Sequence, residues 1–226
     1  MISINNLSFN YEEVNILDSI DLIIKNNGLT CLVGGNGVGK STLLNLIVGE
    51  LELQVGAIHY NDKNINKSDL LSKISYLPSV LYDPLYITVQ ELLNLSRFHN
   101  KGFLNFKLES EDKKKIQFSI EKCGLQNYSN RIFSSLSSGE KQKVWLAFCI
   151  AQDKNFIFLD EALNNLDYDN KDIFFNLLKE ISINKGVLIS THNIDMVIKY
   201  ADRVLVLKDK KIVYDGLPKE DLYKII

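Results

Sequence analysis

The feature that most constrains this chain is a glycine-rich segment, GGNGVGKST, at residues 34–42. It contains the pattern G-x-x-x-x-G-K-[ST], in which backbone N–H groups and a lysine surround phosphate oxygens. The apolar residues 29–33 before it predict a buried strand, and the apolar positions within residues 43–48 after it predict a helix. A strand, a glycine loop and a helix in this order predict a triphosphate-binding site in an α/β fold.

The chemistry of a triphosphate explains each residue type in this loop. Gly34, Gly37 and Gly39 allow the backbone to curl, so that its N–H groups converge on oxygens. The helix that begins near Lys40 adds the positive end of its dipole. Lys40 is expected to reach the β- and γ-phosphates, and the Ser41 hydroxyl is expected to ligate Mg²⁺.

A pair of carboxylates follows a second apolar strand. Residues 156–159 are all apolar, which predicts a strand covered on both faces. Asp160 then falls at the carboxyl end, where parallel sheets bind their ligands. We expect Asp160 to hold Mg²⁺ through water and Glu161 to orient or deprotonate an attacking water. The alternative is a surface turn that happens to carry two acids.

Composition excludes several other classes of protein. The 226 residues carry a net charge of −2 with no strongly basic patch, so nucleic acid is not expected as a partner. Lys113, Lys114 and Lys115 are the densest basic run and are interpreted as a solvated helix face. Three widely spaced cysteines without a C-x-x-C pair predict neither a zinc site nor a disulfide framework, and they fit a reducing compartment.

Targeting and membrane signals are also missing from the pattern. The first six residues lack the charged and apolar blocks of a signal peptide. The longest apolar stretch, residues 144–151, is too short to cross a bilayer. Any membrane role is therefore expected to come through a partner.

Hydrophobic periodicity divides the chain into an α/β core and a helical insertion. Residues 1–84 and 151–226 are predicted to form the core, and residues 85–150 a helical subdomain within a single domain. Thr88 and Glu91 form a capping box that opens the first inserted helix. The other predicted helices are 41–49, 110–123, 140–151, 172–183 and 195–200, and the predicted strands lie within 2–33 and at 57–60, 74–77, 156–159, 187–190, 204–207 and 212–214.

A third segment, LSSGE at residues 136–140, makes the prediction more specific. Together with the glycine loop and the paired carboxylates it resembles the ATP-binding-cassette (ABC) ATPases, over essentially the whole chain. The resemblance implies a P-loop core with an N-terminal antiparallel β subdomain and an inserted helical subdomain. It also implies that Ser137 and Gly139, at a helix N-terminus, grip the γ-phosphate held by a second subunit. Two ATP molecules would then be enclosed in a dimer of identical or related chains. Ser138 replaces the second glycine of the usual pattern.

The resemblance assigns further residues to the ATP site. Asn36 and Thr42 belong to the phosphate loop, and Thr42 would touch the α-phosphate. Asp167 lies in the loop that crosses the dimer interface in this family. His192 matches the histidine that contacts the γ-phosphate and holds the catalytic base in place. Lys40, Glu161 and His192 form the catalytic set that the resemblance implies. Tyr11 lies where the family places the aromatic that stacks on adenine, with Phe9 as the competing candidate. His59 and His99 match nothing and are interpreted as structural or surface residues.

Ser79 is the departure from the family pattern with the largest expected effect. The family usually has a glutamine after Pro78 that senses Mg²⁺ and the attacking water. A serine side chain is too short to span the same gap. The substitution predicts slower hydrolysis, or a bound water in place of the amide.

The resemblance also points to a cellular role. The stretches 87–93, 97–99, 68–73 and 200–203 look like the ATPases that power import of ferric siderophores, haem and cobalamin. This implies ATP hydrolysis coupled to membrane permease subunits, at the cytoplasmic face of the cell membrane. Two alternatives remain: an ABC transporter subunit for another substrate, and a soluble ABC ATPase of iron–sulfur cluster assembly.

Overall fold

The computed structural model describes residues 1–98, 107–163 and 166–226, so His99 lies outside the described residues. The strands are β1 Ile2–Tyr11, β2 Val14–Ile24, β3 Gly28–Val33, β4 Val55–Tyr60, β5 Lys63–Asn64, β6 Ile74–Leu77, β7 Phe156–Asp160, β8 Gly186–Ser190, β9 Arg203–Lys208 and β10 Lys211–Gly216. The helices are α1 Lys40–Ile47, α2 Lys67–Leu71, α3 Val89–Leu95, α4 Ser110–Lys122, α5 Ser138–Ala151, α6 Tyr168–Ser182 and α7 Ile194–Tyr200, with 3-10 turns at Phe133–Ser135 and Glu220–Lys224.

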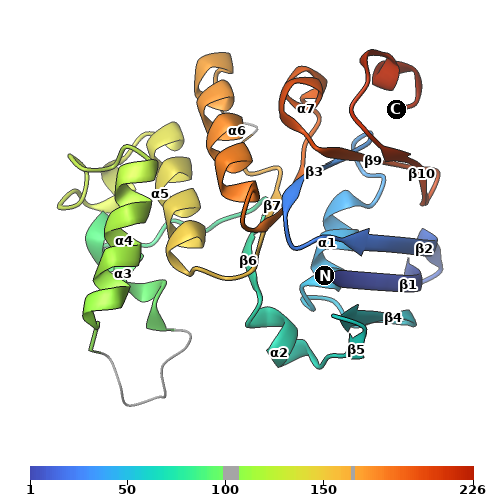
Figure 1. Cartoon of the computed structure of the whole chain (residues 1–226), viewed down its shortest axis with the longest axis horizontal. Helices are drawn as coiled ribbons and strands as arrows, with labels where there is room; N and C mark the ends of the chain where they lie inside the picture. The colour runs from blue at the N-terminus through green and yellow to red at the C-terminus, as the bar shows by residue number, and fades with distance from the viewer. Residues whose placement is uncertain (99–106, 164–165) are drawn as a thin grey trace.

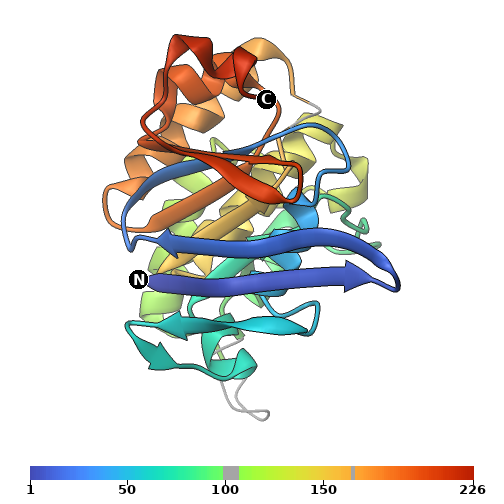
Figure 2. The same ribbon diagram turned by 90° about the vertical axis from the view of Figure 1, so that its right-hand side faces the viewer.

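Two sheets organise the fold. A four-stranded antiparallel sheet has the order β2-β1-β4-β5, and Figure 2 shows it facing the viewer. A six-stranded sheet has the order β10-β9-β3-β8-β7-β6, in which all neighbours are parallel except β10 and β9. The predicted α/β core with an antiparallel N-terminal sheet is thereby confirmed. Helices α3, α4 and α5 lie together at the opposite end of the molecule from the antiparallel sheet (Figure 1).

Strand β7 explains how the layers are held together. Its side chains alternate between the two faces of the sheet, so each face needs its own cover. Phe156 and Phe158 belong to the hydrophobic cluster shared with α1 and the antiparallel sheet. Ile157 and Leu159 belong to the cluster shared with α3 to α7. The predicted strand covered on both faces is therefore confirmed, and α1 is packed between the two sheets.

The first residues of the helices show where the sequence patterns place a helix start correctly and where they place it several residues too far along the chain. The capping box of Thr88 and Glu91 opens α3 as predicted. Helix α5 begins at Ser138 rather than residue 140, because Ser137 caps it by accepting from the Glu140 backbone N–H. Helix α6 begins at Tyr168 rather than residue 172, because the Asp167 side chain accepts from the Asn170 N–H. Strand β5 and helix α2 are short and carry no strong apolar period, and they were not predicted.

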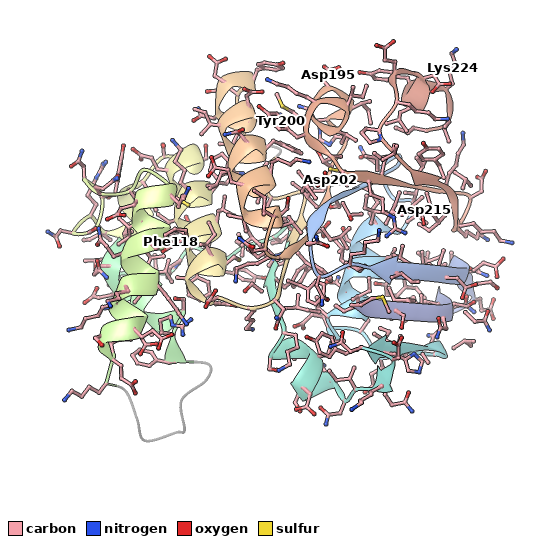
Figure 3. The ribbon with its side chains drawn as sticks, in the orientation of Figure 1. Phe118, Asp195, Tyr200, Asp202, Asp215 and Lys224 are labelled. Atoms are coloured by element: carbon pink, nitrogen blue, oxygen red, sulfur yellow. The ribbon has the colours of Figure 1, made fainter. Side chains whose placement is uncertain are left out.

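Polar contacts fasten the strands at the edge away from the glycine loop. Asp202 accepts a hydrogen bond from the Leu29 N–H at 2.8 Å and pairs with Lys179 of α6. Arg203 donates from its Nε to the Asp215 carboxylate at 2.6 Å, which joins β9 to β10. Figure 3 labels Asp202 and Asp215 at this edge. The first contact joins the start of β3 to the residue pair that follows α7, and the second joins the two strands of the terminal hairpin.

The three cysteines are buried core residues. Cys31, Cys123 and Cys149 are free thiols with no disulfide between them. Burial raises the pKa of the Cys123 and Cys149 thiols to about 12, so they stay protonated at neutral pH.

A buried ion pair ties the ends of three helices together. Arg97, just after α3, donates from its Nε to Asp112 Oδ1 at 3.0 Å, and both side chains are under 10% exposed. Arg97 also donates to the backbone oxygens of Ala151 and Gln152 at 2.7 and 2.8 Å. One guanidinium group therefore satisfies the carboxylate in the first turn of α4 and the last carbonyls of α5.

We expect Arg97→Met to lower the free energy of unfolding by about 3 kcal/mol, because the buried Asp112 carboxylate would lose its ion pair with the guanidinium group and the last carbonyls of α5 would lose a donor. Urea titration followed by the fluorescence of Trp145, which packs against Phe133 and Phe148, measures this loss. The matched control is Lys122→Met, which breaks an exposed pair with Glu180 and should cost about 0.5 kcal/mol or less. Equal losses in the two variants would contradict the interpretation.

Candidate active site

The glycine loop opens into a hollow of about 370 Å³ at the carboxyl ends of β3 and β7. Residues from four separate parts of the chain line it. They are Tyr11, Ile16, Asn36, Gly37, Gly39, Lys40, Ser41, Thr42 and Glu161. The structure thus brings most of the residues predicted for the phosphate and adenine contacts into one pocket, together with the predicted base.

Two glycines of the loop are required by its shape. Gly39 is the N-cap of α1 with a φ of 107°, in the left-handed region that favours glycine. A Cβ at this position would lie 2.9 Å from Ile16 Cγ2. A Cβ on Gly34 would lie 2.3 Å from the backbone oxygen of Leu207, so only glycine permits this approach to β9. The loop is therefore held tightly between the start of α1 and the sheet.

Lys40 is a buried cation with defined partners. Its side chain is 4% exposed, and its Nζ donates to the backbone oxygens of Gly34 and Gly35 at 3.0 and 2.8 Å. Its Nζ also lies 3.6 Å from Glu161 Oε1. A buried ammonium ion needs such partners, because desolvation of an unpaired charge is costly. Lys40 thereby joins the glycine loop of β3 to the carboxylate that follows β7.

The two carboxylates lie on neighbouring positions but in different environments. Asp160 is the last residue of β7, is 1% exposed, and accepts from the Ser190 hydroxyl at 2.5 Å. The Glu161 side chain is 29% exposed and faces the pocket. Its φ of 51° is left-handed, which costs a non-glycine residue about 1 kcal/mol. Such strain is characteristic of functional positions.

Tyr11 and Phe9 are now distinguished by position. Phe9 is 6% exposed and belongs to the core of the antiparallel sheet, whereas Tyr11 is 46% exposed and lines the pocket. The two rings pack edge to face with centroids 4.9 Å apart. Tyr11 therefore offers the ring that is accessible for stacking, and the buried ring of Phe9 packs against it.

His192 lies beside the glycine loop, in a neighbouring hollow of about 450 Å³. This hollow is lined by Gly34, Gly35, Asn36, His192, Ile194, Tyr223 and Ile226. Asn36 borders both hollows, so the histidine and the phosphate pocket share one residue of the loop. Tyr223 donates to Asp195 Oδ1 at 2.6 Å, which holds the C-terminal turn against α7; Figure 3 labels Asp195 and the turn residue Lys224.

Seven of the predicted residues are not in the lining of the phosphate pocket: Gly34 and His192, which line the neighbouring hollow, the buried Asp160, and Ser79, Ser137, Gly139 and Asp167. Ser79 is exposed in the loop after β6, and Ser137 is exposed at the start of α5. Asp167 caps α6, where the Asn170 N–H holds the pKa of its carboxyl below the ordinary value. Gly139 lies next to Leu166, because a Cβ on Gly139 would be 3.3 Å from Leu166 Cδ2. The segment 136–140 therefore contacts the loop at Leu166, and neither lines the phosphate pocket.

Sequence reasoning missed Ser190 and Ile16. Ile16 forms part of the pocket wall beside Gly39. Ser190 is fully buried and touches both carboxylate residues. The signal that could have found it is a lone hydroxyl at the end of an otherwise apolar strand, directly before Thr191 and His192.

The oxygen donors at this end of the sheet fit a hard divalent cation. Ser41 lines the pocket, and Asp160 is buried at the end of β7 directly before Glu161, which also lines it; both offer oxygen atoms, the ligands that Mg²⁺ prefers. Within residues 1–98, 107–163 and 166–226, no group of three or more His, Cys, Asp or Glu side chains could hold a metal by itself. A site with one carboxylate and one hydroxyl matches Mg²⁺, which keeps several waters and takes its other ligands from phosphate groups.

Taken together, a phosphate loop between β3 and α1 and paired carboxylates after β7 define a nucleoside-triphosphate-binding ATPase of the P-loop class. Comparison with known families narrows this class. The model of the ABC transporter family matches residues 17–164. This chain belongs to the ABC transporter family of ATP-binding subunits, and it is an ATPase that binds ATP.

Known relatives cover nearly the whole chain. The petrobactin import ATP-binding protein FpuC of Bacillus anthracis is 33% identical over 227 residues, which span 98% of this chain and 83% of the relative. The iron(3+)-hydroxamate import ATP-binding protein FhuC of Bacillus subtilis strain 168 is 29% identical over 225 residues, 97% of this chain and 83% of the relative. The structure of cbiO1 from Clostridium perfringens, described as part of the ABC transporter complex cbiONQ, superposes with a TM-score of 0.84 at 26% identity, covering 99% and 91% of the two chains.

The position of Ser79 generates a testable prediction about turnover. Ser79 follows β6, which pairs with β7 next to Asp160, so a longer amide side chain there can reach toward the carboxylates. We expect Ser79→Gln to raise basal ATP hydrolysis about threefold or more, measured by phosphate release. The matched control is Val80→Gln, which adds the same amide at the next, exposed position. Unchanged or reduced turnover in Ser79→Gln would contradict the prediction.

Proposed function

We propose that this chain is the ATP-hydrolysing subunit of an importer for iron complexes. The observation that carries the proposal is the 33% identity to a petrobactin import protein over 98% of the chain. The pocket that joins Lys40, Ser41 and Glu161 supplies the chemistry of hydrolysis. ATP-driven dimer closure would move the permease between its two conformations through its higher affinity for the closed state.

The proposed division of roles follows the geometry of the pocket. Tyr11 stacks on adenine, and the N–H groups of Asn36, Gly37 and Gly39, with Gly34 shaping the loop, surround the phosphates. Lys40 binds the β- and γ-phosphates. Thr42 contacts the α-phosphate. The support for this assignment is that all these residues except Gly34 line one hollow.

The reacting end of the triphosphate lies toward the carboxylates in this proposal. Ser41 and Asp160 would hold Mg²⁺, which neutralises charge on the phosphate oxygens. Glu161 orients the attacking water and accepts its proton, since its carboxylate lies 3.6 Å from Lys40 Nζ and faces the pocket. His192, on the other side of Asn36, contacts the γ-phosphate.

A second subunit is part of the proposal because residues 136–140, the signature segment, lie outside the pocket. Ser137 and Gly139 share a surface with Leu166 and Asp167, and we propose that this surface closes over the ATP bound by a second copy or a related chain. The start of α5 carries the positive end of the helix dipole, which suits an anion. Residues 85–150 would act as a helical subdomain that transmits this closure.

The permease surface is proposed at the loop between β6 and α3. Val80, Tyr82, Leu85 and Tyr86 are 71%, 89%, 67% and 91% exposed there, and an exposed apolar patch of this kind is characteristic of an interaction site. Lys141 of α5 pairs with Asp83 in the same loop at 2.5 Å, which links the loop to the signature helix. No helix among the described residues combines the length and apolar character needed to span a bilayer. We therefore propose a peripheral position on the inner face of the membrane, reached through permease subunits.

The experiment that tests the transport proposal is uptake of radiolabelled ferric chelates in cells that lack this gene. Complementation with the wild-type chain should restore uptake, whereas Lys40→Ala should restore less than about 1% of it, because the loop loses its phosphate-binding cation. Lys114→Ala, an exposed lysine far along the chain from the pocket, is the matched control and should behave as wild type. Normal uptake without the gene would overturn the iron assignment, while membrane fractionation would separate a transporter subunit from a soluble assembly factor.

A further inference from the structure

We propose that Ser190 is a positioning residue of the ATPase reaction, which sets the carboxylate of Asp160 and the backbone of Glu161 with a single hydroxyl group. Neither the phosphate loop nor the signature segment contains it. It is the last residue of β8, and it pairs in parallel register with Asp160, the last residue of β7. The register places both side chains on the same face of the sheet, at the edge where the pocket opens.

The contacts of Ser190 are complete and buried. The residue is 0% exposed. Its Oγ donates to Asp160 Oδ1 at 2.5 Å and accepts from the Glu161 N–H at 3.0 Å. The Glu161 nitrogen also lies 3.2 Å from the backbone oxygen of Ser190. The hydroxyl and the carbonyl of Ser190 therefore both accept from the Glu161 N–H. A hydroxyl has one proton to donate, and here that proton goes to the carboxylate.

This arrangement has two consequences for the reaction. The hydrogen bond to Oδ1 fixes the rotation of the Asp160 carboxylate, and it thereby sets the direction in which the other oxygen would meet a cation. The bond from the Glu161 N–H supports the left-handed backbone of Glu161, whose φ is 51°. That backbone turn directs the Glu161 side chain into the pocket instead of along the strand. One hydroxyl therefore orients both acids.

Ser190 is also continuous with the segment that carries His192. The Thr191 N–H donates to the backbone oxygen of Leu32 at 3.1 Å, and the Asn193 N–H donates to Thr191 Oγ1 at 3.1 Å. The end of β8 is thus fastened to β3 immediately before the glycine loop. Ser190 joins Asp160 and Glu161 to the end of β8 through its hydrogen bonds. The positions of the two acids and of the segment that carries His192 therefore depend on the same end of one strand.

The inference rests on the proposed roles of Asp160 and Glu161 and is independent of the transported cargo. The test compares Ser190→Thr with Ser190→Val, two variants of nearly the same shape that differ in the hydroxyl. Ser190→Ala, which adds no volume to the buried position, serves if the larger side chains disturb folding. Asp160→Asn in the same assays reports separately on the proposed role of the carboxylate.

Three readouts separate positioning from a structural role. Compared with Ser190→Thr, we expect Ser190→Val and Ser190→Ala to show about tenfold slower turnover, since a hydrogen bond to a charged group is lost. The Mg²⁺ concentration for half-maximal turnover should rise about fivefold. Affinity for a fluorescent ATP analogue in EDTA should stay within about twofold of wild type, while its enhancement by Mg²⁺ is lost.

Turnover and Mg²⁺ dependence of Ser190→Val within about twofold of Ser190→Thr would overturn the proposal. Equal loss of affinity with and without Mg²⁺ would also overturn it, because that result describes a general disturbance of the pocket. If Asp160→Asn keeps full turnover, the proposed role of Asp160 fails as well. If Asp160→Asn is inactive while Ser190→Val is active, only the inference about Ser190 fails.

Discussion

The buried ammonium ion of Lys40 is the constraint on which the rest of this structure depends. It is 4% exposed and has backbone partners at Gly34 and Gly35 and a carboxylate at Glu161. These partners come from the loop after β3 and the end of β7, so the charge is tolerated only where two parallel strands end at the same edge. Strand β8 lies between β3 and β7 and supplies Ser190 at that edge. The order of the sheet therefore creates the site, and α1 directs its N-terminus toward it.

The fold also keeps the phosphate pocket apart from the segment 136–140. The phosphate pocket lies at the sheet edge, and the signature segment lies at the start of α5 beside Leu166. Arg97 binds the end of α5 to α3 and α4, so the signature helix belongs to a rigid group of three helices. The loop 78–87 runs between this group and β6, and the pair of Asp83 and Lys141 connects them again. The exposed apolar loop is thus in direct contact with helix α5 through this ion pair.

Much of the fold and site could be predicted from the sequence, because strong local patterns carried it. The strands within residues 2–33, the apolar run of β7 and the capping box of α3 each appeared where expected. The sequence of the phosphate loop predicted the pocket, because most of the pocket lining comes from the nine consecutive residues 34–42. The choice between Tyr11 and Phe9 required the structure, because it depends on which ring faces the pocket. Ser190 was not predicted, because its role arises from the register between β7 and β8, and no local pattern encodes that register.

The most direct test of the account is the single-turnover rate of ATP cleavage by Glu161→Gln with ATP already bound. In the proposed mechanism Lys40 and the loop bind ATP and Glu161 accepts the proton, so binding and cleavage should separate. It predicts that the variant binds ATP as the wild type does and forms ADP at least about a hundredfold more slowly. Cleavage at the wild-type rate would contradict the account, because the water would then be activated by a group other than Glu161.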